Sequence, residues 1–176
     1  MNQPKLILLI SVLLIALVTD LWKRKIYNVL VLLGLLGGLA INIHSMGTIG
    51  VIFWLKGSLL ALFVFVPLYV LRGMAAGDVK LMMVVGGIVG LPLIVDVMLY
   101  VYIAGGLIAL LIVLFRKQGQ NLLNNLKAIM LNHLLRVRTG VNLNMSLNST
   151  QSVGKMPYAV AIFAGTLYAL HKHNIL

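Results

Sequence analysis

The sequence predicts an all-α protein, a polytopic bundle of about six transmembrane helices in a single domain covering residues 1–176. Hydrophobic residues make up 61% of the 176 positions and charged residues only 10%, whereas soluble domains carry about a quarter charged residues. The apolar residues gather into long runs, and most basic residues lie in the short segments between them. A chain of this length cannot hide so much apolar surface from water, so lipid is expected to solvate much of it.

Each apolar run approaches the length that a bilayer requires, about 20 residues with roughly 17 to 25 tolerated. The first run follows Lys5 and has the basic start of a signal peptide. Because no small-x-small site precedes a polar region and further apolar runs follow, we interpret it as a span. The segment Pro92–Asp96 divides the fourth run from the fifth. The predicted spans are Leu6–Trp22, Ile26–Ile43, Ile49–Leu71, Val79–Val95, Val97–Phe115 and Met156–Leu170.

The basic residues predict an orientation in the phospholipid bilayer. Eleven of the fourteen fall on one side of the predicted spans, which is therefore expected to be cytoplasmic, with both termini outside. This asymmetry accounts for the net charge of +11, so no nucleic-acid partner is expected. The eleven are Lys23, Arg24, Lys25, Arg72, Lys80, Arg116, Lys117, Lys127, Arg136, Arg138 and Lys155, and the other three are Lys5, Lys56 and Lys172.

The segment 118–154 is the one long polar connection and is expected to be a cytoplasmic loop. Apolar residues recur in it at helical spacing, which predicts an amphipathic helix lying on anionic headgroups between spans five and six. The Asn- and Ser-rich stretch Asn142–Ser152 is typical of a tether. Elsewhere, the four-residue spacings of Gly34 with Gly38 and of Gly86 with Gly90 predict close helix packing.

Acidic residues are scarce, since the chain has no glutamate and three aspartates, Asp20, Asp78 and Asp96. Asp20 ends the first predicted span and Asp78 precedes the fourth, so both are expected at the cytoplasmic side, with Asp96 near the opposite face. An ionisable residue at the edge of a span is costly and is a functional candidate. A carboxylate pair suits peptide hydrolysis, because the ionised member takes a proton from water while its protonated partner polarises the scissile carbonyl.

Other roles for the two aspartates stay open on position alone. Asp78 directly precedes a helical run, which is a favoured capping position. Asp20 has Lys23 and Arg24 within one turn and is able to pair with them.

The residues around the two aspartates resemble a known family. The first block reads Thr19-Asp20-Leu21-Trp22-Lys23-Arg24-Lys25-Ile26-Tyr27-Asn28, and the second reads Gly73-Met74-Ala75-Ala76-Gly77-Asp78-Val79-Lys80-Leu81. Together they resemble the prepilin peptidases, or type IV leader peptidases, which are bacterial membrane aspartic proteases with a Gly-x-Gly-Asp motif. The short form found in tight-adherence pilus systems is the most similar. The segment Lys155-Met156-Pro157-Tyr158-Ala159 is also similar to the family's entrance to its last span.

The resemblance implies catalytic roles for Asp20 and Asp78, no cofactor, and cleavage of prepilin-like substrates at the cytoplasmic face of the bacterial inner membrane. Two departures affect the expected geometry. Ala75 replaces the first glycine of the motif, and Tyr27 replaces the proline of the family's Ile-Pro-Asn, whose asparagine is Asn28. Longer relatives also methylate the new N-terminus through a cysteine-containing domain. This chain has no cysteine, so no methylation is expected.

Supporting residues are predicted around the pair. Gly77 is expected to let the chain bend so that Asp78 faces Asp20, and Asn28 belongs to the first motif. Lys80 is expected to contact headgroups or, alternatively, a substrate carboxylate. The four histidines, His44, His133, His171 and His173, are not spaced as a metal set, so no metal is expected.

Two alternatives remain beside the prepilin peptidase. One is an enzyme similar to signal peptide peptidase, which would use the same pair of aspartates on other membrane segments. The other is a transporter or an assembly scaffold, although a transporter is expected to place its charges near mid-membrane and to contain repeats. The sequence identifies neither the pilin nor the oligomeric state.

Overall fold

The computed structural model describes residues 1–71, 73–115 and 158–175. The predicted cytoplasmic loop 118–154, with its amphipathic helix and tether, lies outside these residues, as do His133 and most of the basic residues assigned to the cytoplasmic side. The chain divides into two compact units, residues 1–105 with 157–176, and residues 106–156. The first unit contains all three aspartates. That the whole chain forms one domain stays a prediction.

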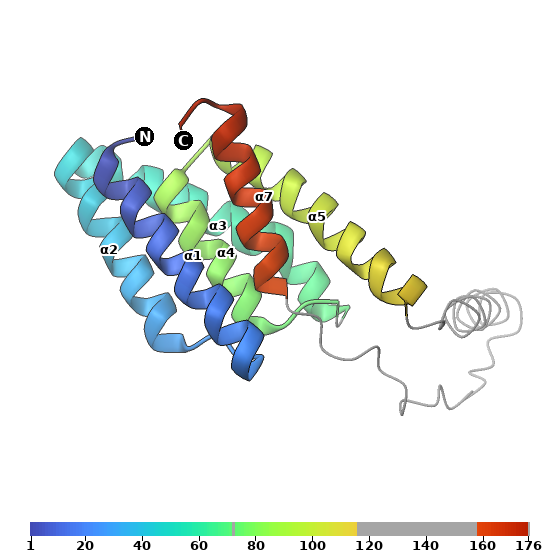
Figure 1. Cartoon of the computed structure of the whole chain (residues 1–176). Helices are drawn as coiled ribbons and strands as arrows, with labels where there is room; N and C mark the ends of the chain where they lie inside the picture. Colours follow the sequence, from blue (N-terminus) through green and yellow to red (C-terminus); the bar gives the residue numbers. More distant parts are fainter. Residues whose placement is uncertain (72, 116–157, 176) are drawn as a thin grey trace, which may run out of the picture. The chain divides into compact units, whose positions relative to one another are not determined.

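Every described element of regular structure is an α-helix, which confirms the predicted class. Successive helices of the first unit run in alternating directions, so the two chain ends lie at the same end of this unit (Figure 1). We call this the terminal end, and we call the opposite one, where α1 finishes, the Asp20 end. The helices are α1 (Gln3–Lys23), α2 (Asn28–Met46), α3 (Thr48–Val70), α4 (Ala76–Val89), α5 (Leu93–Phe115) and α7 (Tyr158–Lys172).

Four described helices, α1, α2, α3 and α5, are long and apolar enough to cross a membrane. Helices α4 and α7 have 14 and 15 residues, short of the about 20 that a full crossing requires. Helix α7 lies close to the sixth predicted span, whereas α4 ends at Val89, six residues before the predicted end of the fourth span. Crossing by these two helices stays a prediction. Asp96, which was expected between spans, lies instead in the first turn of α5 because this helix already begins at Leu93.

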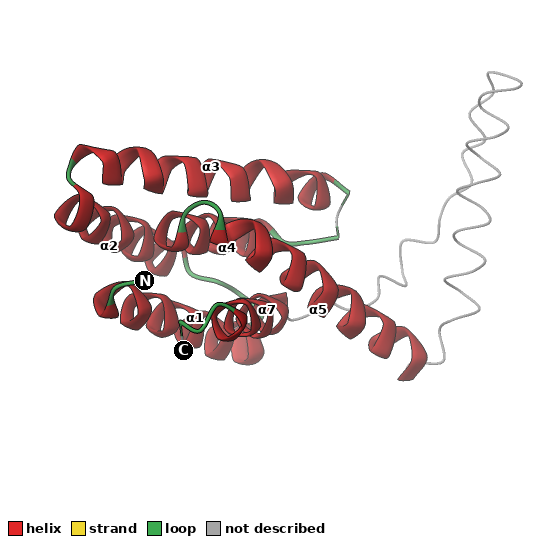
Figure 2. Ribbon diagram, turned by 90° about the horizontal axis from the view of Figure 1, so that it is seen from above, coloured by secondary structure: helices red, strands yellow, loops and turns green. Residues whose placement is uncertain are grey.

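Helix α4 lies in the middle of the first unit. It packs against α1, α2, α3 and α7, and Figure 2 shows it between α3 on one side and α1 with α7 on the other. Ten of its fourteen residues are buried. Because neighbouring helices cover α4, little of its backbone is exposed to lipid although the helix is short. The same packing holds Asp78 in a fixed position.

Glycines allow the close approach of α4 to its neighbours. An added Cβ at Gly57 on α3 would lie 2.0 Å from the backbone oxygen of Gly86, and one at Gly86 would lie 2.3 Å from that of Gly57. On α2, Gly34 and Gly38 face the side chains of Val84 and Ile88. The predicted packing glycines therefore lie along α4, and Gly57, which belongs to neither predicted pair, has the closest approach among them to the backbone of a neighbouring helix.

A buried polar link ties α1, α2 and α4 together toward the terminal end. The Lys5 ammonium donates a hydrogen bond to Asn42 Oδ1 at 2.7 Å and lies over the ring of Phe53. The Asn42 amide donates to the carbonyl oxygens of Gly38 at 2.7 Å and Gly87 at 3.1 Å. Because α1 carries Asp20 and α4 carries Asp78, this link fixes the relative position of the two helices on which the predicted pair depends.

Candidate active site at the Asp20 end

Asp20 and Asp78 come to the same end of the first unit. Asp20 lies in the last turn of α1 and Asp78 is the third residue of α4, and these helices pack against each other in opposite directions. Both side chains are buried, with 6% of Asp20 and 5% of Asp78 exposed. The charge of Asp20 acts on the Asp78 carboxyl. Two carboxylates that repel each other inside a protein favour a state in which they share one proton.

Helix α7 forms the third wall of this site. The backbone N–H of Ala159, in the first turn of α7, donates a hydrogen bond to Asp20 Oδ2 at 3.2 Å. The N–H groups of a helix's first turn have no partner within the helix, and this end of a helix dipole attracts negative charge. In the sequence, Ala159 stands out only as part of the family resemblance, and no local signal there indicates its contact with Asp20.

Asp78 occupies the corresponding position on its own helix. The Ala75 N–H donates to Asp78 Oδ2 at 3.1 Å, and the Asp78 N–H donates to the Ala75 carbonyl, also at 3.1 Å. Asp78 therefore has a capping role, but as the third residue of α4 and not at the position directly before the helix that the sequence suggested, which Ala75 occupies. It uses one oxygen only, since no described residue donates to Oδ1 of either Asp78 or Asp20. Each carboxylate is thus held by a helix N-terminus and keeps one oxygen for chemistry.

The two motif positions of α4 show different constraints. Ala75 has φ −84° and ψ 154°, an extended conformation that any residue adopts. The alanine in place of the family's glycine therefore strains nothing at this position. Gly77 does not provide the bend that the sequence suggested, because it is the second residue of α4 and has no left-handed backbone. An added Cβ there would lie 3.2 Å from Ile26 Cβ, so Gly77 allows the segment before α2 to approach.

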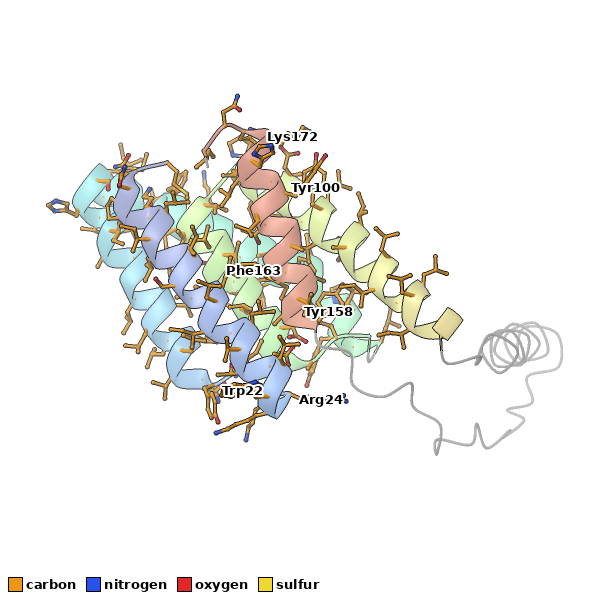
Figure 3. The ribbon with its side chains drawn as sticks, viewed as in Figure 1. Trp22, Arg24, Tyr100, Tyr158, Phe163 and Lys172 are labelled. Carbon is orange, nitrogen blue, oxygen red and sulfur yellow. The ribbon has the colours of Figure 1, made fainter. Side chains whose placement is uncertain are left out.

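Basic and polar residues surround the site at its exposed edge. Arg24 ends α1 in the left-handed region, its N–H donates to the Asp20 carbonyl, and its charge acts on the Asp20 carboxyl. Figure 3 shows Arg24 beside Trp22 at the Asp20 end, far from Lys172. The two predicted supporting residues Lys80 and Asn28 meet each other, since the Lys80 ammonium donates to Asn28 Oδ1 at 3.1 Å.

Asp96 is far from this site. It lies at the terminal end, where its Oδ2 is 2.6 Å from His173 Nε2. Both side chains are more than one-third exposed. Asp96 therefore lies at the opposite end from Asp20, as expected from its place in the sequence, and its contact with His173 is a feature that the sequence does not indicate. Within the described part of the chain, no three His, Cys, Asp or Glu side chains gather as metal ligands would.

Comparison with protein families agrees with the geometry. The chain matches the model of the type IV leader peptidase family over residues 7–110, more than half of its length, and the match includes Asp20 and Asp78. No curated protein and no solved structure matches the chain. Because the family consists of aspartic peptidases of the inner membrane that process prepilins, it favours an enzyme over a transporter or a scaffold. The chain therefore belongs to the type IV leader peptidase family, as an aspartic peptidase of the bacterial inner membrane.

Proposed function

We propose that this protein cleaves the leader peptide of a prepilin-like membrane substrate at the cytoplasmic face, with Asp20 and Asp78 activating water. The observation that carries the proposal is the pair of buried carboxylates at one end of the bundle, each held through Oδ2 by a backbone N–H. The two Oδ1 atoms accept no hydrogen bond from a described residue, so they are available to a water molecule and to the scissile peptide.

The pair performs hydrolysis with one shared proton. The ionised carboxylate takes a proton from water, and the water oxygen bonds to the scissile carbonyl carbon while the protonated partner keeps its proton and donates a hydrogen bond to the carbonyl oxygen. The C–N bond then breaks as a proton passes from the pair to the leaving nitrogen, which restores the starting state. Since the pair titrates as a unit, neither residue is assigned a fixed role as acid or base.

The proposed arrangement in the membrane has six crossings, with both termini outside and the Asp20 end at the cytoplasmic surface. The loop 118–154 is then cytoplasmic. The basic residues Lys23, Arg24 and Lys25 support this orientation, because positive charge accumulates on the cytoplasmic side. The site then lies at the membrane edge, where water reaches the carboxylates and the leader of a membrane-anchored pilin meets its hydrophobic helix.

Co-expression with a prepilin tests the proposed activity. The prepilin is expected to shift to the mobility of mature pilin when this protein is present, with a new N-terminus directly before the hydrophobic helix. A prepilin whose junction residues are altered should remain uncut. Cleavage inside the hydrophobic helix, or of unrelated membrane segments instead of prepilins, would favour an enzyme similar to signal peptide peptidase.

Labelling of single cysteines tests the orientation. Cysteines replacing Lys25 and Ala75 are expected to be shielded from an impermeant thiol reagent in intact cells, and those replacing Ser45 and Asn174 are expected to react. All four positions are exposed, and the chain has no native cysteine to interfere. Labelling of Ala75→Cys with shielding of Ser45→Cys would invert the arrangement and remove the cytoplasmic site.

A further inference from the structure

Tyr158 is a third buried polar side chain at the Asp20 end of the bundle. It is the first residue of α7, and Figure 3 shows it in the half of that helix toward Trp22 and Arg24. Its side chain is buried, with 8% exposed. The Asp78 carboxyl acts electrostatically on its phenol group, and the next residue, Ala159, donates its N–H to Asp20. Tyr158 is therefore next in the chain to the residue that holds Asp20, and it lies within electrostatic range of Asp78.

The Tyr158 hydroxyl has no hydrogen-bond partner among the described residues. This oxygen is nevertheless not completely covered by the protein. Within the described residues, the fully covered polar side-chain atoms that lack a partner are Trp54 Nε1 and Thr166 Oγ1, and the Tyr158 oxygen is not one of them. A buried phenol usually finds a partner. A hydroxyl without a partner, at the same end of the bundle as the two aspartates, is able to donate to a molecule that enters the site.

The end of the Tyr158 ring that carries the hydroxyl lies against the backbone of α5. An added Cβ at Gly105 of α5 would lie 2.6 Å from the Tyr158 hydroxyl oxygen, so the ring fits where this helix has no side chain. Tyr102, the nearby phenol on α5, is already committed, since its hydroxyl donates to the Val64 carbonyl at 2.9 Å and its ring stacks on Phe65. Of the two phenols, only that of Tyr158 has its donor unused.

We propose that Tyr158 is a further catalytic residue, whose hydroxyl donates a hydrogen bond to the carbonyl oxygen of the scissile peptide. This role rests on the proposed function of Asp20 and Asp78. Negative charge develops on the carbonyl oxygen as water adds, while one member of the pair is engaged in taking the proton from that water and the other is the only carboxyl that donates to this oxygen. A fixed neutral donor stabilises that charge without adding another titrating group, and its effect is large where water is excluded.

Tyr158→Phe is the direct test, because it removes one oxygen and keeps the ring. With purified full-length protein and a prepilin, we expect kcat to fall by about 10²-fold, the lower range for loss of one oxyanion donor. KM and the melting temperature in detergent should stay near the wild-type values. The matched control is Tyr168→Phe, since Tyr168 is exposed and its ring contacts Tyr100 near the terminal end. It should cleave at the wild-type rate.

Asp20→Asn, measured in the same assay, separates this inference from the proposed function. An inactive Asp20→Asn together with a fully active Tyr158→Phe would overturn the role of Tyr158 and leave the aspartic mechanism standing. An active Asp20→Asn would overturn both. A Tyr158→Phe protein that loses activity only through a higher KM or a lower melting temperature would show a packing role and would also overturn the inference.

Discussion

Asp78→Asn and Asp20→Asn are each expected to abolish prepilin cleavage while the protein remains folded in the membrane. The amide keeps the size of the side chain and removes the group that exchanges a proton with water. Because the two carboxylates act as one unit, the loss in rate should be about 10⁴-fold or more, and the double variant should be no worse than either single one. Mobility of the co-expressed pilin, followed by rates with purified protein, measures the effect.

Asparagine is the informative replacement because Asp78 also accepts a hydrogen bond that stabilises the start of its own helix. Asp78 Oδ2 accepts from the Ala75 N–H at the start of α4. The asparagine oxygen can still accept this bond, whereas alanine would remove it, and the loss of one such hydrogen bond typically costs about 1 kcal/mol. Asp78→Asn therefore isolates the loss of chemistry from the loss of helix stability.

Asp96→Asn is the matched control for these variants. Asp96 lies at the terminal end and contacts His173, an interaction that the asparagine oxygen retains in part. Cleavage by Asp96→Asn is expected to be nearly normal.

The wild-type rate should fall toward both acid and alkaline pH, because a pair that shares one proton fails when both members are protonated or both are ionised. Near-normal processing by Asp78→Asn would rule out the aspartic mechanism.

Much of the fold follows from hydropathy and charge. The run Ile26–Ile43 predicted a helix that the structure has at Asn28–Met46, and Ile49–Leu71 predicted the one at Thr48–Val70. Long apolar segments are reliable signals because a membrane helix must satisfy its backbone hydrogen bonds internally. The alternating direction of the helices then brings Asp20 and Asp78 to one end, which the bias of basic residues anticipated.

The detailed site did not follow from the sequence, because it depends on contacts between residues far apart in the chain. Nothing in the local sequence indicates that Ala159 donates its N–H to Asp20, 139 positions earlier. From the sequence, Lys5 was expected only to be one of the three basic residues on the outer side. In the structure it is buried and donates a hydrogen bond to the side-chain amide of Asn42. Such pairings depend on how the helices rotate against each other, and hydropathy leaves that rotation undetermined.

The glycine contacts between helices could also be predicted only in part from the sequence. Spacing singled out Gly34, Gly38, Gly86 and Gly90, and the structure places these glycines against neighbouring helices. The same rule passed over Gly57 because no second glycine stands four residues away on α3. Its importance comes from the opposite helix, where Gly86 presents a bare backbone.

Gly57→Ala is accordingly expected to destabilise the protein severely. In an isolated helix this change is favourable by about 1 kcal/mol, since glycine is a poor helix former. Here the new methyl carbon would lie 2.0 Å from the Gly86 backbone oxygen and 2.8 Å from its carbonyl carbon. Backbone atoms cannot rotate away, so α3 and α4 must separate. Overpacking costs about 1–3 kcal/mol and occasionally more, and this contact is expected at the upper end.

Gly106→Ala is the control that decides the sign of this effect. Gly106 lies in α5, and an added Cβ there meets no atom within 4 Å. The control should therefore be as stable as the wild type or slightly more so, by the gain in helix propensity. Thermal unfolding of both variants in detergent makes the comparison, with prepilin cleavage as a second readout because α4 carries Asp78. Equal melting temperatures for Gly57→Ala and Gly106→Ala would mean that α3 and α4 are not packed backbone to backbone, and that the position of Asp78 does not depend on this contact.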